Sequence, residues 1–97
     1  MYRIRIVPDA TEELHQVPVF YRRHIEQAIE KQLGQEPARV TKNRKCLEGQ
    51  AAGFEYEPPL WELRIGEWRV FYDVDEMTVV IRAIRKKPSS RRTGEIL

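Results

Sequence analysis

The C-terminal part of the chain, residues 60–84, alternates between apolar and polar residues, and this pattern constrains the fold more than any other. Alternation of this kind is typical of strands that bury one face. The Gly66-Glu67 pair suits a two-residue type II′ hairpin turn, because glycine accepts the positive φ of the first turn position. Three successive strands are predicted, and their apolar positions are Trp61, Leu63, Ile65, then Trp68, Val70, Tyr72, Val74, then Val79, Ile81, Ala83.

The first 33 residues predict one strand and two helices. Residues 2–7 alternate and form the strand, and Asp9 with Glu12 has the spacing of a capping box at the start of the first helix. Pro18 ends that helix because it lacks a backbone N–H. Residues 19–33 form the second helix, which ends at a glycine. Its apolar stripe at helical spacing consists of Tyr21, Ile25, Ala28, Ile29 and Leu33.

Residues 34–59 form a polar connection that is long for a compact domain, so we expect it to contain a short strand at residues 53–57 or to be functional. The element order is then β-α-α-β-β-β(-β). This order predicts an α+β fold in which the helical hairpin packs on one face of a mostly antiparallel, twisted sheet. A length of 97 residues fits a single domain, residues 1–97, in which residues 88–97 are expected to be a mobile basic tail.

Composition excludes several classes of protein. One Cys and two His are too few for a disulfide framework or a structural zinc site, so we expect no metal and no cofactor. No apolar run is long enough to span a bilayer, and the N-terminus lacks the apolar stretch of a signal peptide. These features predict a cytoplasmic protein without a membrane partner.

The hairpin register predicts a row of arginines. The turn pairs Ile65 with Trp68, Leu63 with Val70 and Trp61 with Tyr72, which places Arg64 opposite Arg69 on the other face. A turn around Asp75-Glu76 would place Arg82 opposite Arg69 as well. Adjacent like charges destabilise a sheet, and guanidinium groups match phosphate oxygens, so the row indicates a polyanion site. Alternatively, Glu62 and Asp73 neutralise the row as surface ion pairs.

Further basic and apolar residues are expected beside this row. Basic residues cluster at Arg39, Lys42, Arg44 and Lys45, and again at Arg85, Lys86, Lys87, Arg91 and Arg92. The apolar residues assigned to the arginine face are Leu60, Phe71, Val80 and Ile84. They could stack bases, dock a protein partner or pack against residues 34–59. The histidines (His15, His24), Cys46 and the tryptophans (Trp61, Trp68) are expected to have structural roles.

Two segments carry a resemblance to a known family. Residues 60–74, LWELRIGEWRVFYDV, and 79–87, VVIRAIRKK, resemble the RelE/ParE toxin superfamily, as do the N-terminal strand, the helical hairpin and the Leu47-Glu48-Gly49 segment. The resemblance implies a toxin of a type II toxin–antitoxin module. RelE-like members cut mRNA in the ribosomal A site, and ParE-like members poison DNA gyrase.

The resemblance also implies partners and an activity. The leading expectation is a metal-independent, ribosome-dependent mRNA endoribonuclease with the ribosome, mRNA and a cognate antitoxin as partners. The antitoxin would cover the arginine face or displace the C-terminal segment. The alternatives are a gyrase inhibitor without nuclease activity and a catalytically inactive relative that serves as a protein-interaction module.

Site residues follow by position from the same resemblance. The arginine of the family's W/Y-R-V strand is Arg69, a candidate for stabilising phosphate charge, and Arg64 is the basic residue of the preceding strand. Glu62 stands where RelE-like members have a lysine, and it is the candidate base because arginine stays protonated. The basic residue after the last strand is Lys86 or Lys87, and a C-terminal tyrosine is missing. The expected RNA-binding residues are Arg82, Arg85, Arg44, Lys45 and Phe71.

Overall fold

The computed structural model describes residues 1–49 and 51–97. Its elements, in chain order, are β1 (Arg3–Ile6), α1 (Pro8–Gln16), α2 (Val19–Leu33), β2 (Arg44–Leu47), β3 (Leu60–Ile65), β4 (Trp68–Asp75), β5 (Thr78–Lys86) and α3 (Thr93–Ile96). The order confirms the predicted α+β architecture and the helical hairpin that ends its first helix before Pro18.

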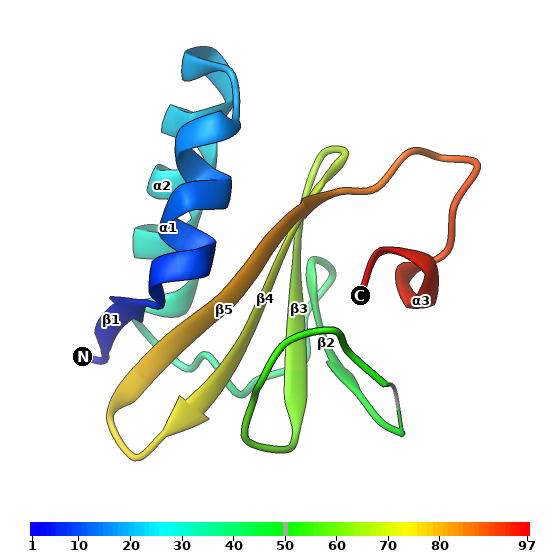
Figure 1. The fold of residues 1–97 in the computed structure, drawn as a ribbon. Helices are drawn as coiled ribbons and strands as arrows, with labels where there is room; N and C mark the ends of the chain where they lie inside the picture. Colours follow the sequence, from blue (N-terminus) through cyan, green and yellow to red (C-terminus); the bar gives the residue numbers. More distant parts are fainter. Residues whose placement is uncertain (50) are drawn as a thin grey trace.

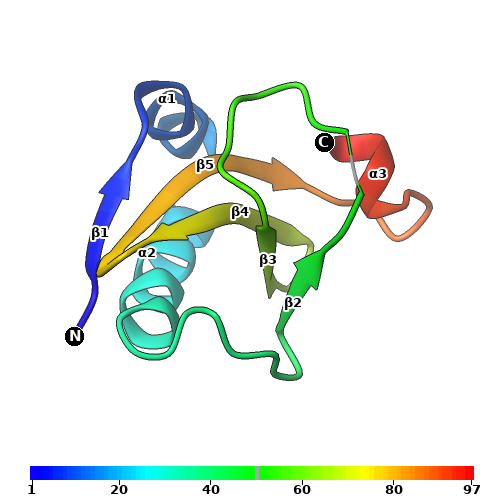
Figure 2. The same ribbon diagram turned by 90° about the horizontal axis from the view of Figure 1, so that it is seen from below.

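One five-stranded sheet forms the centre of the molecule, with the strand order β1-β5-β4-β3-β2. The pairing of β1 with β5 is parallel, and the three other pairings are antiparallel. Helices α1 and α2 cover one face of the sheet, and α3 lies on the other side (Figure 1). Seen from below, α3 lies near β2 and the loop that leads to β3 (Figure 2). The sheet therefore has a helix-covered face and a second face that stays open at one end.

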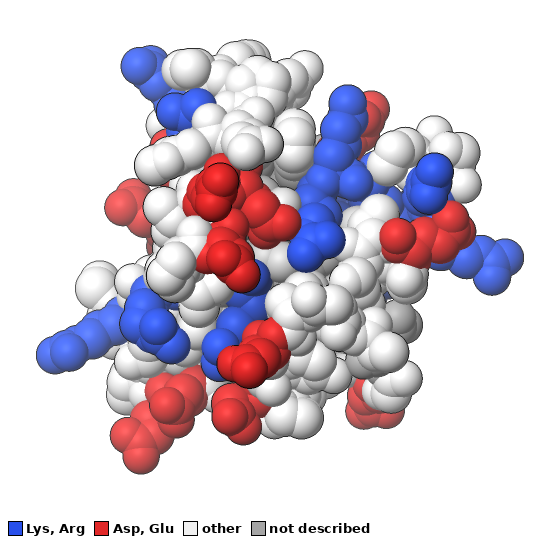
Figure 3. All heavy atoms as spheres, viewed as in Figure 1, with Lys and Arg blue, Asp and Glu red and all other residues white. Residues whose placement is uncertain are grey.

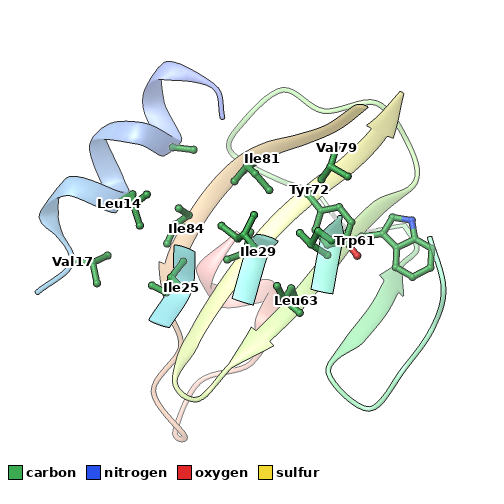
Figure 4. Close-up of a cluster of buried hydrophobic side chains, with 13 residues drawn as sticks. Leu14, Val17, Ile25, Ile29, Trp61, Leu63, Tyr72, Val79, Ile81 and Ile84 are labelled. Atoms are coloured by element: carbon green, nitrogen blue, oxygen red, sulfur yellow. The ribbon is translucent and has the colours of Figure 1, made fainter. Parts of the chain in front are cut away.

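The main core lies between the two N-terminal helices and the sheet. Ile25, Ile29 and Leu33 of α2 are buried, which confirms most of the predicted stripe (Figure 4). Tyr21, at the start of that stripe, is 49% exposed. Burial of each large aliphatic side chain stabilises the fold by about 1.5–3 kcal/mol, so this layer fixes how the helices sit on the sheet.

The β3–β4 hairpin has the predicted register. Ile65 pairs with Trp68, and Arg64 lies opposite Arg69. Gly66 has a φ of 59° while Glu67 is not in the positive region, as a type II′ turn requires. This turn fixes which side chains reach each face of the hairpin.

The predicted register between β4 and β5 is wrong. The turn residues are Glu76 and Met77, one position later than expected, so Val74 pairs with Val79. A β-bulge then follows, because Phe71 pairs with Ala83 while Tyr72 pairs with Ile81, which leaves Arg82 as the extra residue. Arg69 consequently lies opposite Arg85. The bulge also exchanges the two sheet faces to which the residues of β5 after Arg82 point. Ile84 therefore joins the core under the helices, and Ala83 faces away from it.

Two local predictions at the chain's turns and caps are also corrected. Helix α1 begins at Pro8 with Val7 as its N-cap, and no side chain caps it, so Asp9 lies in the first turn instead of at the cap. Proline suits this first position because its missing N–H needs no partner there. The strand in the long connection is β2, at residues 44–47, and not at residues 53–57.

The C-terminal segment folds back onto the sheet. Ile96 and Leu97 pack on a second, smaller core of Leu47, Leu60, Phe71 and Ala83. The backbone N–H of Gly53 donates to the carbonyl of Leu97 at 2.9 Å, and a guanidinium N–H of Arg85 donates to the carbonyl of Ile96 at 3.3 Å. This packing covers part of the second face and leaves the region near the β3–β4 turn open.

Candidate nucleic-acid interface

A basic pocket lies at the open end of this second face, with a volume of about 180 Å³. Residues from β2, β3, β4 and the segments around them line it: Lys42, Asn43, Arg44, Lys45, Glu62, Arg64, Arg69, Lys87 and Thr93. Six of these side chains are cationic, and Glu62 is the one carboxylate among the described lining residues. We call this site the basic pocket.

Arg69 forms the floor of the basic pocket. One terminal nitrogen of its guanidinium donates to the carbonyls of Gly66 at 2.7 Å and Trp68 at 2.9 Å. Its Nε lies 3.6 Å from Glu62 Oε2. Burial lowers the pKa of Arg69, an effect that Glu62 opposes and Arg64 reinforces. The turn and the carboxylate thus hold this guanidinium in one orientation.

Glu62 is almost fully buried beside Arg69. Lys45 Nζ lies 3.3 Å from its Oε1, and the hydroxyl of Thr93 donates to Oε2 at 2.9 Å. Both carboxylate oxygens therefore have partners, and Thr93 brings the C-terminal segment to the edge of the pocket. A base must be reachable by its substrate, so Glu62 can act as one only after Thr93 has moved away.

The remaining cations of the pocket lack acidic partners. Among residues 1–49 and 51–97, none of Lys42, Arg64 and Lys87 forms an ion pair. Arg64 and Lys42 are exposed, and Lys87 is half-buried. Like charges that share a small hollow repel one another, and a bound anion relieves this repulsion. The arrangement suits a phosphate group.

Arg44 has a structural role in this conformation. Its guanidinium donates to the carbonyls of Gln32 at 2.9 Å and Glu36 at 2.7 Å, near the C-terminal end of α2. These bonds tie β2 to the helix and leave the side chain as a wall of the pocket. Lys45, the second residue of β2 that was expected to bind RNA, has its ammonium group close to Glu62.

Two arginines expected beside the pocket lie elsewhere, each next to a carboxylate. Arg82 donates to Asp73 at 2.8 Å through Nε, and Asp73 is fully buried. Arg85 lies 2.8 Å from Glu13 of α1 and its guanidinium carbon lies 5.7 Å from the centre of the Phe54 ring. The continuous arginine row is therefore wrong, and the alternative of ion-paired arginines holds for this part of the sheet. Figure 3 shows acidic and basic side chains side by side over α1 and β5.

Two further expected site residues also lie outside the basic pocket. Lys86 is on the helix side of β5, where its Nζ lies 3.8 Å from Glu67. Phe71 is fully buried in the second core, which confirms packing rather than base stacking in this conformation. Of Lys86 and Lys87, the two basic residues expected after the last strand, the structure therefore places Lys87 at the pocket.

Sequence reasoning missed two lining residues, Asn43 and Thr93. Lys42 belongs to the basic cluster that was expected beside the arginines, and the structure places it at the β3–β4 hairpin. The carbonyl of Asn43 accepts the backbone N–H of Arg64 at 2.7 Å, which joins the two segments. Thr93 carries no pattern that would have revealed its contact with Glu62.

Other site classes gain no support from the described part of the chain. Within residues 1–49 and 51–97, no group of three His, Cys, Asp or Glu side chains lies close enough to hold a metal ion. In the same residues, no helix has the length and apolar character needed to cross a membrane.

The fold and the pocket together define a small α+β protein with a cation-rich site on its sheet. Residues 4–88 match the family model described as the ParE toxin of the type II toxin–antitoxin system parDE. The chain belongs to this family, within the RelE/ParE superfamily, and is a toxin of a type II toxin–antitoxin system. Comparison with curated proteins finds no match.

Solved toxin structures share the fold. One chain of the RelBE2 toxin–antitoxin complex from Mycobacterium tuberculosis is 27% identical with a TM-score of 0.71, covering 89% of this chain and 98% of that one. A chain of the archaeal RelE–RelB complex from Pyrococcus horikoshii is 22% identical with a TM-score of 0.68, covering 91% and 97%. The isolated Escherichia coli RelE toxin is 15% identical with a TM-score of 0.66, covering 96% and 89%.

Proposed function

We propose that this toxin cuts mRNA on the ribosome and that the basic pocket holds the scissile phosphate. The observation that carries the proposal is the group of cations without acidic partners, Lys42, Arg64 and Lys87, around the buried Arg69. A guanidinium binds two phosphate oxygens at once, and an ammonium adds a compact point charge. The pocket volume of about 180 Å³ suits a phosphate group.

The reaction needs no metal. The ribose 2′-oxygen attacks the neighbouring phosphorus, and the bond from phosphorus to the 5′-oxygen breaks. The products are a 2′,3′-cyclic phosphate and a 5′-hydroxyl end. The protein must accept the 2′-hydroxyl proton, stabilise the added negative charge on the phosphate and give a proton to the 5′-oxygen.

The pocket offers one residue type for each task. Arg64 and Arg69 stabilise the phosphate, because arginine keeps its charge at any accessible pH. The ammonium of Lys87 donates the proton to the leaving 5′-oxygen. Glu62 accepts the 2′-hydroxyl proton once Thr93 has been displaced from its Oε2. The Glu62 role can be tested separately from the arginine roles.

The test is to express the toxin alone and to map RNA ends that carry a 5′-hydroxyl, in cells and on purified mRNA-programmed ribosomes. Cuts within ribosome-bound mRNA support the proposal. Arg64→Gln should remove them, whereas Arg39→Gln, an exposed arginine paired with Glu36 outside the pocket, should leave them intact. If Glu62→Gln cleaves normally while Arg64→Gln does not, the base is another group.

Inhibition of DNA gyrase is the second candidate. Two observations favour it: the matching family model is that of ParE toxins, and the pocket's carboxylate is buried under Thr93. This activity predicts DNA-damage signalling with intact mRNA and loss of supercoiling by purified gyrase. A toxin that causes no growth defect would instead be an inactive interaction module.

We also propose an antitoxin as the physiological partner. The M. tuberculosis and P. horikoshii neighbours were solved as complexes of a toxin with its antitoxin. Coexpression with the product of an adjacent short open reading frame should restore growth and yield a complex that purifies as one species. Growth arrest that persists with every neighbouring gene product would contradict this partner.

A further inference from the structure

A second hollow lies on the other side of the β3–β4 hairpin, between the start of α2 and the turn. Its volume is about 440 Å³, and its lining residues are Pro18, Tyr21, His24, Ile65, Gly66, Glu67, Trp68 and Lys86. The adjoining surface of α2 exposes large apolar side chains, with Phe20 57% exposed and Tyr21 49% exposed. Exposed groups of this size and number mark binding surfaces in soluble proteins.

Four aromatic rings follow one another across this surface. Phe20 stacks on Tyr21 with 5.4 Å between the ring centres. On its other side, Phe20 contacts His24 edge to face, with 4.6 Å between the ring centres. Tyr21 lies 6.2 Å from Trp68 of β4. These contacts place the four rings side by side on one surface. We call these four residues the aromatic surface.

The aromatic surface adjoins the basic pocket around the end of the hairpin. Neighbouring residues of a strand point to opposite faces, so Arg64 and Arg69 reach the pocket while Ile65 and Trp68 reach the aromatic side. The turn and the end of β5 lie between the two sites, because Lys86 lines the aromatic side and Lys87 the pocket. Figure 1 shows this turn at the end of the sheet, beside the segment that leaves β5, whose Lys87 N–H donates to the carbonyl of Glu67 at 2.6 Å.

We propose that the aromatic surface is a base-stacking subsite for single-stranded RNA whose phosphate lies in the basic pocket. The inference rests on the proposed function and extends it to a second contact. Single-stranded RNA exposes its bases, and proteins bind them by stacking on Phe, Tyr, Trp and His. A stacking contact tolerates any base, so this subsite adds affinity without adding a strict sequence preference.

Charge favours RNA over a protein segment as the occupant. Arg23 is exposed beside Phe20 and His24 in an adjoining hollow and forms no ion pair among the described residues. Lys86, at the edge nearest the turn, lies 3.8 Å from Glu67, so its charge is already matched. A strand that leaves the basic pocket would thus meet one further unpaired cation, Arg23. The same surface without this cation would suit an apolar helix equally well.

The experiment compares oligomer binding by the wild-type protein and a variant that keeps the surface apolar but removes its stacking rings. The probes are a single-stranded RNA of about eight nucleotides, the same oligomer without bases at its central positions, and a dinucleotide. The variant combines Phe20→Leu with Tyr21→Leu. Met77→Ala, a change at a 52% exposed apolar residue of the β4–β5 turn, is the control.

We expect the leucine variant to bind the long oligomer at least about fivefold more weakly, which is the lower range of one lost stacking contact. It should bind the dinucleotide as the wild type does, and the Met77 control should bind both normally. The oligomer without bases should bind the wild type and the variant equally. The half-buried Trp68 should also lose fluorescence when the wild type binds the long oligomer.

Equal binding of the long oligomer by the wild type and the leucine variant would overturn the subsite. A variant with Phe20→Asp and Tyr21→Asp that binds RNA normally but no longer binds an antitoxin would assign the surface to protein docking instead. Failure of the proposed function looks different: Arg64→Gln would then leave the affinity for every oligomer unchanged.

Discussion

Two regions of the open sheet face use arginine in opposite ways. At the bulge in the middle of β5, Arg82 donates to Asp73, which also accepts the backbone N–H of Glu57 at 2.8 Å. Near the β3–β4 turn, six cations line a hollow with one carboxylate, Glu62. The comparison teaches that an arginine on a strand does not itself indicate phosphate binding. The informative quantity is the excess of cations over the carboxylates that reach them.

The comparison predicts that the region with the Arg82–Asp73 ion pair contributes more to the stability of the fold than the region with the basic pocket. Asp73→Ala should lower the free energy of unfolding by about 3 kcal/mol, because it leaves Arg82 and the Glu57 N–H without their buried partner. Urea unfolding of the wild type and the variant measures the change. A cost below about 1 kcal/mol would show that the pair contributes no more than an exposed one.

The pocket region should show the reverse behaviour. Arg64→Gln is expected to reduce mRNA cleavage about 100-fold, since it removes a group that stabilises charge on the phosphate. Its free energy of unfolding should change by less than about 0.5 kcal/mol, because Arg64 is exposed. Initial cleavage rates on programmed ribosomes and urea unfolding give the two quantities. A large stability loss with normal cleavage would reverse the assignment of the two regions.

A smaller effect is expected where β4 meets the connection to β2. The Tyr72 hydroxyl donates to the carbonyl of Pro37 at 2.7 Å, so Tyr72→Phe should cost about 1 kcal/mol at neutral pH. Burial raises the pKa of Tyr72 above its usual value, with smaller contributions from Arg44, which lowers it, and Cys46. Ionisation therefore favours the unfolded chain.

The sign of the pH dependence follows from this shift. Below the usual tyrosine pKa of about 10, the stabilising contribution is fully present, and it falls as the pH rises towards the higher folded value. Wild-type stability should thus decrease between about pH 10 and 12 more steeply than that of Tyr72→Phe. Urea midpoints across this range provide the measurement, and parallel curves would contradict the role of Tyr72.

Much of the fold could be predicted from the sequence because its signals are local. Gly66-Glu67 fixed one hairpin register, and the spacing of Ile25, Ile29 and Leu33 gave the packed face of α2. The bulge at Arg82 could not be predicted from the sequence. The apolar and polar residues of this strand alternate in a way that is compatible with either register, so the pattern does not show that one residue is left unpaired. The later turn by itself would have placed Ile84 opposite Arg69, and the bulge then placed Arg85 there.

The candidate site was predictable to a similar extent. Arg64, Arg69 and Glu62 belong to one hairpin, so register arithmetic brought them together. Lys42 and Thr93 come from segments far away in the chain. Their positions depend on the long connection and on the packing of the C-terminal segment, for which the sequence holds no periodic signal.

The central claim is that the pocket cations bind phosphates and the ion-paired arginines do not. It is tested most directly by the salt dependence of single-stranded RNA binding by the wild type, Arg64→Gln and Arg82→Gln. A plot of log affinity against log salt concentration has a slope of about −0.7 for each phosphate contact. Arg64→Gln should make the slope shallower by about 0.7, and Arg82→Gln, measured where the variant is fully folded, should leave it unchanged. Equal slopes for Arg64→Gln and the wild type, or a shallower slope for Arg82→Gln alone, would contradict the claim.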